Sequence, residues 1–342
     1  MRFSIVLSSS SVNHHVKGAG PVPVLVVFAP TACGKTRLAL ELFGKDSASP
    51  FAGCAELISA DSMQVYKGMD IGTAKPNALE LVQLPHHLID LQEPDVPFSA
   101  GEFVRRSDQL CREIYGRGRL PLVLGGTGFY IKNFLCGLPT TPQADQELRV
   151  QLQRRMEREG AASLYRQLQE LDPVAAGRIH CNDHYRILRA LEVCLSSGRP
   201  QSSFLLSPQL RSQFNFCIII LWRERKELYQ RIDQRIARMM EEGLVQEVAS
   251  LVAAGYKADD PGMQAIGYRE FLLPEVQELE EPLRTQRIQE LICRDSRRYA
   301  KRQYTYFKGI PQAHHFHAED SDAIQSHIGA FIRESFLGES FL

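Results

Sequence analysis

Residues 24–36 read Val-Leu-Val-Val-Phe-Ala-Pro-Thr-Ala-Cys-Gly-Lys-Thr, and this segment carries the strongest structural signal in the chain. Its first five residues form an unbroken apolar run rich in β-branched side chains, which predicts a buried parallel strand. A short loop follows, and a helical pattern begins near Lys35. Strand, loop and helix in this order are typical of a phosphate-binding loop in an α/β protein.

The loop at residues 29–36 nearly matches the P-loop pattern, which is Gly, four residues and Gly-Lys-Ser/Thr. Ala29 replaces the first glycine, and because alanine tolerates positive φ poorly we expect negative φ there. The backbone N–H groups and the helix N-terminus would cradle a diphosphate. Lys35 would neutralise phosphate charge, and Thr36 would face a Mg²⁺ ion. The alternative is an ordinary strand–turn–helix corner.

Further strands and helices alternate along the chain on both sides of this loop. Ser99 and Glu102 have the spacing of a capping box and open a helical pattern that runs toward Tyr115. This alternation predicts a doubly wound parallel sheet, whose ligands bind at the carboxyl ends of the strands. The predicted strands after the first are residues 56–60, 87–90, 120–124 and 216–221.

The pattern changes after Pro139, where helical periodicity replaces the strands. We therefore expect an α/β fold with a P-loop NTPase-like parallel sheet core, an inserted all-helical domain and a helical C-terminal part. His314, His315 and His317 favour a solvated tail over a metal site, because no second ligand pair lies nearby. The expected segments are a flexible extension at 1–22, the core at 23–143 and 214–312, the insertion at 144–213, and a tail at 313–342.

Composition excludes several classes of protein. The chain has 342 residues, 44% hydrophobic and 23% charged, which rules out a disordered or collagen-like chain. It has no apolar run long enough for a membrane helix. The eight cysteines form no C-x-x-C pair and lie mostly in apolar runs, as reduced core thiols of a cytoplasmic protein do.

The net charge is zero, from 40 basic and 40 acidic residues, and this balance alone argues against a nucleic-acid-binding protein. The local distribution differs. Residues 149–200 hold nine Arg, no Lys and six acidic residues, and residues 284–308 hold eight basic and two acidic residues. Ten acidic residues at 241–281 offset these basic segments. Arginine-rich helices and basic residues interleaved with aromatics suit contact with RNA, although a solvated helix face is the alternative.

Asp61 follows the second predicted strand and therefore lies at the same edge of the sheet as the loop. From the residues alone, Asp61 is a magnesium ligand, a general base or a helix N-cap. The run from Asp61 to Pro76 closely resembles the tRNA dimethylallyltransferases, also called isopentenyl-diphosphate:tRNA transferases. The chain ends at Leu342 without the zinc-finger extension of some eukaryotic relatives, so we expect a bacterial-type enzyme. Further matches, in the family's order, are Pro85–Asp90, Gly125–Tyr130, Asn182, Asp183, Arg186, Arg189–Glu192, Gln264–Glu270 and Arg298–Gln303.

The resemblance implies transfer of a dimethylallyl group from dimethylallyl diphosphate to N6 of the adenosine 3′-adjacent to the anticodon of tRNA. Asp61 matches the family's proposed base, and Thr31, Lys35 and Arg235 are the other catalytic candidates. A solvated helix charge is the alternative for Arg235. The implied cofactor is Mg²⁺. The implied diphosphate-binding residues are Ala29, Pro30, Thr31, Ala32, Cys33, Gly34, Lys35 and Thr36.

The target adenine stacks in the anticodon loop, so an enzyme acting on its N6 has to extract it. The expected partners are tRNA and dimethylallyl diphosphate, with no membrane, and we expect a monomer. For single arginines such as Arg149, a surface charge pattern is the alternative. The resemblance places against tRNA the residues Asp61, Ser62, Met63, Gln64, Thr127, Arg149, Tyr185, Arg186, Ile187, Leu188, Arg189, Gln264, Ala265, Ile266, Gly267, Tyr268 and Arg269.

Three other functions compete with this one. An adenylate prenyltransferase would share the active site but would not need the arginine-rich insertion or the basic C-terminal helix. A P-loop kinase of a small metabolite would leave the run from Asp61 to Pro76 unexplained. A non-catalytic RNA-binding module is the remaining alternative.

Overall fold

The computed structural model describes residues 20–139, 141–142, 145–204, 207 and 209–337. The chain divides into two compact units, Met1–Leu135 with Arg211–Leu342, and Cys136–Leu210. The second unit corresponds to the insertion predicted at 144–213. It begins eight residues earlier and ends three residues earlier than predicted. Of the expected extension at 1–22, only residues 20–22 lie in the described part of the chain, and Val22 already begins a strand.

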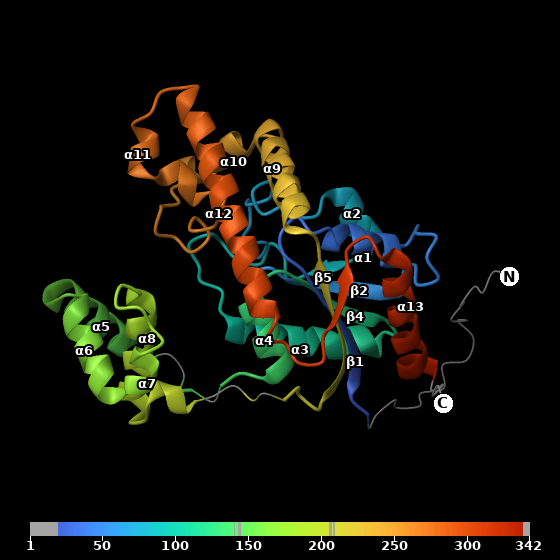
Figure 1. Cartoon of the computed structure of the whole chain (residues 1–342), viewed down its shortest axis with the longest axis horizontal. Helices are drawn as coiled ribbons and strands as arrows, with labels where there is room; N and C mark the ends of the chain where they lie inside the picture. The colour runs from blue at the N-terminus through green and yellow to red at the C-terminus, as the bar shows by residue number, and fades with distance from the viewer. Residues whose placement is uncertain (1–19, 140, 143–144, 205–206, 208, 338–342) are drawn as a thin grey trace. The chain divides into compact units, whose positions relative to one another are not determined.

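The first unit contains a six-stranded sheet in which all pairs are parallel (Figure 1). The strand order is β3-β2-β4-β1-β5-β6, so the first strand of the chain lies inside the sheet. This topology agrees with the predicted doubly wound sheet. The strands are β1 Val22–Phe28, β2 Ala55–Ala60, β3 His86–His87, β4 Leu120–Gly125, β5 Phe214–Trp222 and β6 His314–His317.

The register brings three strand ends to one level. Phe28 and Ala60 both pair with Gly125, so β1, β2 and β4 end side by side. The phosphate-loop segment, Asp61 and Gly126 each follow directly, and therefore meet at one edge of the sheet. β2 and β4 are buried along their whole length because both faces of the sheet are covered, which explains the unbroken apolar run of β4 and the mostly apolar sequence of β2, whose polar residues Glu56 and Ser59 are buried too.

Helices cover both faces of this sheet. Leu25 and Val27 of β1 share one hydrophobic core with Leu38 and Leu42 of α1, while α3 lies against β1, β2 and β4. Ser99 caps α3, where its side chain accepts from the N–H of Glu102, as predicted. The helices of the first unit are α1 Lys35–Phe43, α2 Ala78–Gln83, α3 Ala100–Gly116, α4 Gly128–Cys136, α9 Arg225–Glu241, α10 Leu244–Ala253, α11 Pro274–Gln277, α12 Leu283–Phe307 and α13 Ser321–Ile332.

Among the described residues of the second unit, the regular secondary structure is all helical, with loops between the helices. Its core contains Leu152, Leu164, Leu168 and Leu191, which recur at helical spacing and pack together. The carboxylate of Asp172 accepts hydrogen bonds from the following helix and from Ser202, and so ties the end of the unit back onto it. The helices are α5 Gln146–Glu159, α6 Ala161–Leu171, α7 Pro173–Ala176 and α8 His184–Ser197.

The strand predicted at 87–90 is wrong beyond His87. Leu88 and Asp90 have φ values of 63° and 51°, and a strand cannot continue through the left-handed region. β3 therefore contains only two residues, and the segment after it turns away from the sheet.

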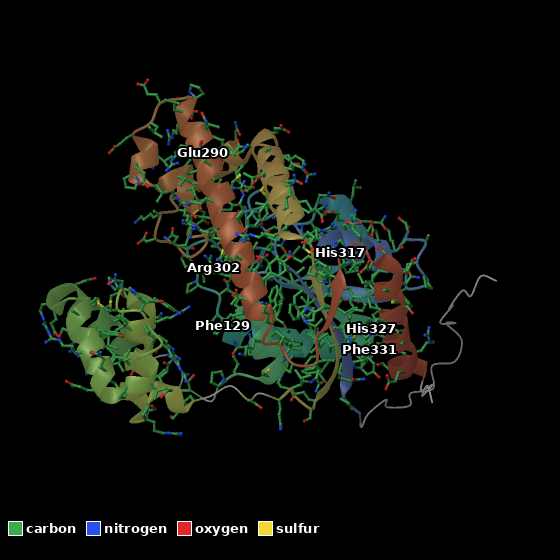
Figure 2. All side chains as sticks on the ribbon, in the orientation of Figure 1. Phe129, Glu290, Arg302, His317, His327 and Phe331 are labelled. Atoms are coloured by element: carbon green, nitrogen blue, oxygen red, sulfur yellow. The ribbon has the colours of Figure 1, made fainter. Side chains whose placement is uncertain are left out.

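The tail predicted at 313–342 is also wrong for most of its length. Residues 314–317 form the sixth strand, and α13 buries Ile324 and Ile328 completely. The rings of His317 and Trp222 lie 4.9 Å apart, and those of His314 and His327 lie 4.3 Å apart (Figure 2). In the described part of the chain, no helix is both long and apolar enough to span a bilayer.

Candidate active site

The loop between β1 and α1 adopts left-handed backbone at two positions. Gly34 has φ 103° and Ala32 has φ 61°. Ala29 does not belong to the described residues with positive φ, which confirms the expectation of negative φ at the missing P-loop glycine. The strain in this loop lies at Ala32, where a residue with a Cβ costs about 1–2 kcal/mol.

Side chains from distant helices hold the start of this loop. The Thr31 N–H donates to Gln303 Oε1 at 3.1 Å, and Arg235 Nη1 donates to Thr31 Oγ1 at 3.2 Å. Gln303 also donates to the Gly126 carbonyl at 2.7 Å, so α12 joins the loops that follow β1 and β4. Gln303 was not predicted as a site residue, because a glutamine within a basic helix gives no signal of this contact.

Two cavities meet at the carboxyl edge of the sheet. The smaller, about 100 Å³, is lined by Lys35 and Thr36, and the larger, about 250 Å³, is bordered by Arg302. Arg302 lies on α12 (Figure 2). Both cavities lie within the first unit. The residues that border both are Thr31, Asp61, Thr73, Arg235 and Tyr299.

Asp61 stands between the two cavities. Its Oδ1 accepts from the Met63 N–H at 2.9 Å, which closes a turn, and no helix follows. The helix N-cap alternative is therefore excluded. No hydrogen bond to its Oδ2 is present among the residues that the structure describes. One carboxylate oxygen thus fixes the side chain, and the other is available to a ligand.

Burial sets the ionisation of the groups around Asp61. Burial lowers the pKa of Lys35 and of Arg235, and the Asp61 carboxylate opposes that shift in both. Burial raises the pKa of the Cys33 thiol to about 11 and that of Tyr299 to about 12. Cys33 is therefore a neutral thiol and no nucleophile at neutral pH, and Tyr299 keeps its proton.

The residues after Asp61 are fixed by hydrogen bonds to neighbouring loops. The Ser62 N–H donates to Thr127 Oγ1 at 3.0 Å. Gln64 accepts from Ser59 at 2.8 Å and donates to the Ala74 carbonyl at 3.1 Å, so its side chain braces β2 against the following loop. Ser62 and Met63 line the larger cavity, and Gln64 lines the smaller.

The segment 264–269 is divided between cavity and core. Gln264, Ala265, Ile266 and Gly267 line the larger cavity, as their predicted role requires. Tyr268 is fully buried, so its side chain has a packing role, and the contact of this position with tRNA stays a prediction. Arg269 pairs with Glu270 at 3.1 Å and with Asp295 at 2.9 Å.

Glu247 of α10 is a site residue that sequence reasoning missed. Its carboxylate accepts the N–H groups of Asp70, Ile71 and Gly72 at 2.9, 2.8 and 3.1 Å, and the Tyr268 hydroxyl at 2.6 Å. Gly72 is required there, because a Cβ would lie 2.5 Å from the Tyr268 ring. One glutamate thus joins the two loops that border the larger cavity.

A Glu247→Gln variant is expected to lose about 1–3 kcal/mol of free energy of unfolding, because an amide cannot accept all four hydrogen bonds. Urea denaturation measures this loss. Glu241→Gln, an exposed glutamate at the end of α9, is the matched control and should change the stability by less than about 0.5 kcal/mol. Equal stabilities of the two variants would contradict the role of Glu247.

In the second unit, the predicted residues fall into exposed and buried sets. The Arg149 guanidinium lies over the ring of Tyr185, 5.6 Å from its centroid, and Tyr185 is 67% exposed. Arg186 is exposed beside Asp183, whereas Arg189 is partly buried and pairs with Glu192 at 2.6 Å. The remaining two residues pack inward: Ile187 is fully buried and Leu188 is partly buried against the same core. The contact of these two positions with tRNA stays a prediction.

The sheet, the loop and the paired cavities suit a group-transfer enzyme. The model of the IPP transferase family matches residues 64–310, so the chain belongs to this family. A relative from Geobacter sulfurreducens named tRNA dimethylallyltransferase is 43% identical over 291 residues, 84% of this chain and 89% of the relative. One of the same name from Clostridioides difficile is 40% identical and covers 92% of this chain and 98% of its own. The crystal structure of a tRNA isopentenylpyrophosphate transferase from Bacillus halodurans is 34% identical with a TM-score of 0.63, covering 92% and 98% of the two chains.

Proposed function

We propose that this protein is a tRNA dimethylallyltransferase, which transfers a dimethylallyl group from dimethylallyl diphosphate to N6 of the adenosine 3′-adjacent to the anticodon. One observation carries the proposal: Asp61 and Arg235 border both a cavity lined by the diphosphate loop and a cavity lined by segment 264–267. A donor in the first cavity and an acceptor base in the second would meet at these two side chains.

The smaller cavity suits the diphosphate of the donor. The loop N–H groups at the start of α1 and the Lys35 ammonium supply donors and positive charge there. When the bond between C1 of the dimethylallyl group and its bridging oxygen breaks, negative charge grows on the diphosphate. Fixed donors stabilise that charge without having to reorganise during the reaction.

The larger cavity suits the adenine. Its exocyclic amine is a weak nucleophile, because its lone pair is delocalised into the ring. As N6 bonds to C1, the Asp61 carboxylate accepts a proton from N6, and diphosphate leaves with the bonding electron pair. Asp61 can do this because its second oxygen takes no part in the turn that its first oxygen closes.

The donor set at the smaller cavity fits Mg²⁺. Thr36 and Asp61 place a hydroxyl and a carboxylate in its lining, and oxygen atoms are the ligands that Mg²⁺ prefers. Among the described residues, no cluster of three or more His, Cys, Asp or Glu side chains could hold a metal by itself. Thr36 would therefore hold Mg²⁺ together with diphosphate oxygens, and the ion would neutralise part of the diphosphate charge.

Recognition of tRNA would use both units. The exposed pair of Arg149 and Tyr185 offers a cation and an aromatic ring, which suit phosphate contact and base stacking. In the first unit, Gln264–Gly267 line the larger cavity, into which the extracted adenine would insert. A monomer located in the cytoplasm remains our expectation.

Incubation with Mg²⁺, dimethylallyl diphosphate and either unmodified tRNA or AMP tests the proposal. We expect prenylation of the tRNA at a single adenosine and none of AMP, which mass spectrometry of nuclease digests would detect. Prenylation of AMP alone would establish the adenylate prenyltransferase instead. Phosphate transfer from ATP without prenylation would establish a kinase.

The affinity for inorganic diphosphate is expected to fall with rising pH. The fall should begin at a pH below 10.5, the ordinary pKa of lysine. Burial lowers the pKa of Lys35 in the free protein, whereas a bound anion favours the ammonium, so binding above that lowered pKa requires proton uptake. Calorimetry across this range measures the effect. Lys35→Arg should bind with a weaker pH dependence, because a guanidinium stays protonated. Identical pH profiles for the two proteins would contradict the role of Lys35.

A further inference from the structure

Two arginines hold the diphosphate loop from outside the cavities. Arg223 Nε donates to the Cys33 carbonyl at 2.8 Å, and Arg231 Nε donates to the Ala32 carbonyl at 3.0 Å. Both arginines follow β5 in the chain, and neither lines the two cavities. They contact backbone carbonyl groups of the loop, which point away from the N–H groups of the peptides that they belong to.

Fixing these carbonyl groups also fixes the N–H groups of the loop. A trans peptide is planar, so a Cys33 carbonyl held by Arg223 directs the Gly34 N–H to the opposite side. Within the described residues, the Gly34 N–H has no acceptor. A Cβ on Gly34 would lie 3.6 Å from Arg223 Nη2 and 3.9 Å from Arg231 Nη2, so both guanidinium groups cover the outer face of this residue.

Arg223 is itself held in one position. Its side chain is 1% exposed and forms ion pairs with Glu227 and Glu319. Although burial alone would lower it, these carboxylates hold the pKa of Arg223 above its ordinary value. The Tyr304 hydroxyl of α12 donates to the Arg223 carbonyl at 3.0 Å. Arg223 therefore has a fixed charge and a fixed orientation.

Glu319 connects this arginine to the C-terminal segment. It lies between β6 and α13, and it also accepts from Arg37 of α1 at 3.2 Å. The residues that were expected to form a tail thus support the loop through one carboxylate. A guanidinium can donate to a carbonyl and two carboxylates at once because its donors lie in a rigid fork, which a lysine cannot match.

We infer that Arg223 is a positioning residue for the transfer reaction, which aims the Gly34 N–H at the departing diphosphate and is itself anchored by Glu319 of the C-terminal segment. The inference rests on the proposed function. An N–H fixed before the reaction stabilises the leaving group without the cost of reorganisation. Arg223 and Arg231 together form a clamp on the loop. Arg231 restrains it at Ala32, where the backbone is left-handed.

Replacing Arg223 with methionine tests this role, because methionine keeps an unbranched chain as far as the position of Nε but removes the guanidinium and all of its donors. We expect the Kd for inorganic diphosphate to rise about tenfold and kcat to fall at least as much, while tRNA affinity stays within about twofold. Calorimetry, single-turnover kinetics and a tRNA filter-binding assay give these three values. Arg225→Met, an exposed arginine two residues further on, is the matched control and should behave as wild type.

Glu319→Gln provides a milder second variant if Arg223→Met does not fold. It should weaken diphosphate binding in the same direction, and the effects of the two substitutions should not add, because they act through one contact chain. Unchanged diphosphate binding in both variants, or an equal loss of tRNA affinity, would overturn the inference. The wild-type protein could also fail to prenylate tRNA while its diphosphate binding still depended on Arg223. That result would refute the proposed function but not the positioning role of Arg223.

Discussion

An Asp61→Asn variant is expected to transfer the dimethylallyl group about 10²- to 10⁴-fold more slowly than the wild-type protein. The amide cannot accept the N6 proton, whereas its oxygen can still accept the Met63 N–H and keep the turn intact. Single-turnover kinetics with saturating tRNA measure the rate. Binding of inorganic diphosphate should change by less than about threefold, since that site depends on the loop and Lys35.

Asp95→Asn is the matched control for this prediction. Asp95 is exposed on the surface and borders neither cavity, so its substitution should leave the rate unchanged. If Asp61→Asn kept its rate within tenfold of wild type, Asp61 could not be the base. A large loss of diphosphate affinity in the same variant would instead indicate that the loop had been disturbed.

An Arg235→Gln variant is expected to lower kcat roughly 10²- to 10³-fold. Arg235 anchors Thr31 and borders both cavities, so its charge lies where the bond between donor and diphosphate would break. A neutral glutamine could keep one hydrogen bond but could not stabilise the departing diphosphate. Stopped-flow or quench-flow kinetics at saturating substrates separate this loss from weaker binding.

Arg238→Gln is the matched control, because Arg238 is exposed almost one turn further along α9. Its variant should keep kcat within about twofold, and Arg235→Lys should recover part of the lost rate because the charge is retained. An unchanged kcat in Arg235→Gln would show that Arg235 takes no part in the transfer, as the alternative of a solvated helix charge requires.

The sequence predicted the architecture well where a local pattern defined an element. The apolar runs of β1 and β4 are unbroken because these strands are buried on both faces, so their composition was a direct signal. β6 gave no such signal. It is a short, histidine-rich strand that depends on its pairing with β5, a contact that no local pattern expresses.

The same distinction applies to the site. The loop and Asp61 belong to contiguous motifs and were found from the sequence. Gln303, Glu247 and Arg223 lie far along the chain from the loops that they hold, and each acts on backbone groups, so nothing in the sequence marks the contact. The resemblance gives the position of Tyr268 in the segment beside the larger cavity but not the orientation of its side chain, which the structure shows to be buried.

The strand order has a consequence for synthesis of the chain on the ribosome. β1 is made first, but its neighbour β5 pairs Cys217 with Leu25, so roughly 190 residues separate the partners. At bacterial and eukaryotic translation rates, that interval lasts about 10 to 40 s. The second unit, whose core is made only of nearby residues, can fold within the delay. Until β5 is made, the edge of β1 that pairs with it has no partner strand, and a nascent chain stalled before residue 214 would be a substrate for chaperones.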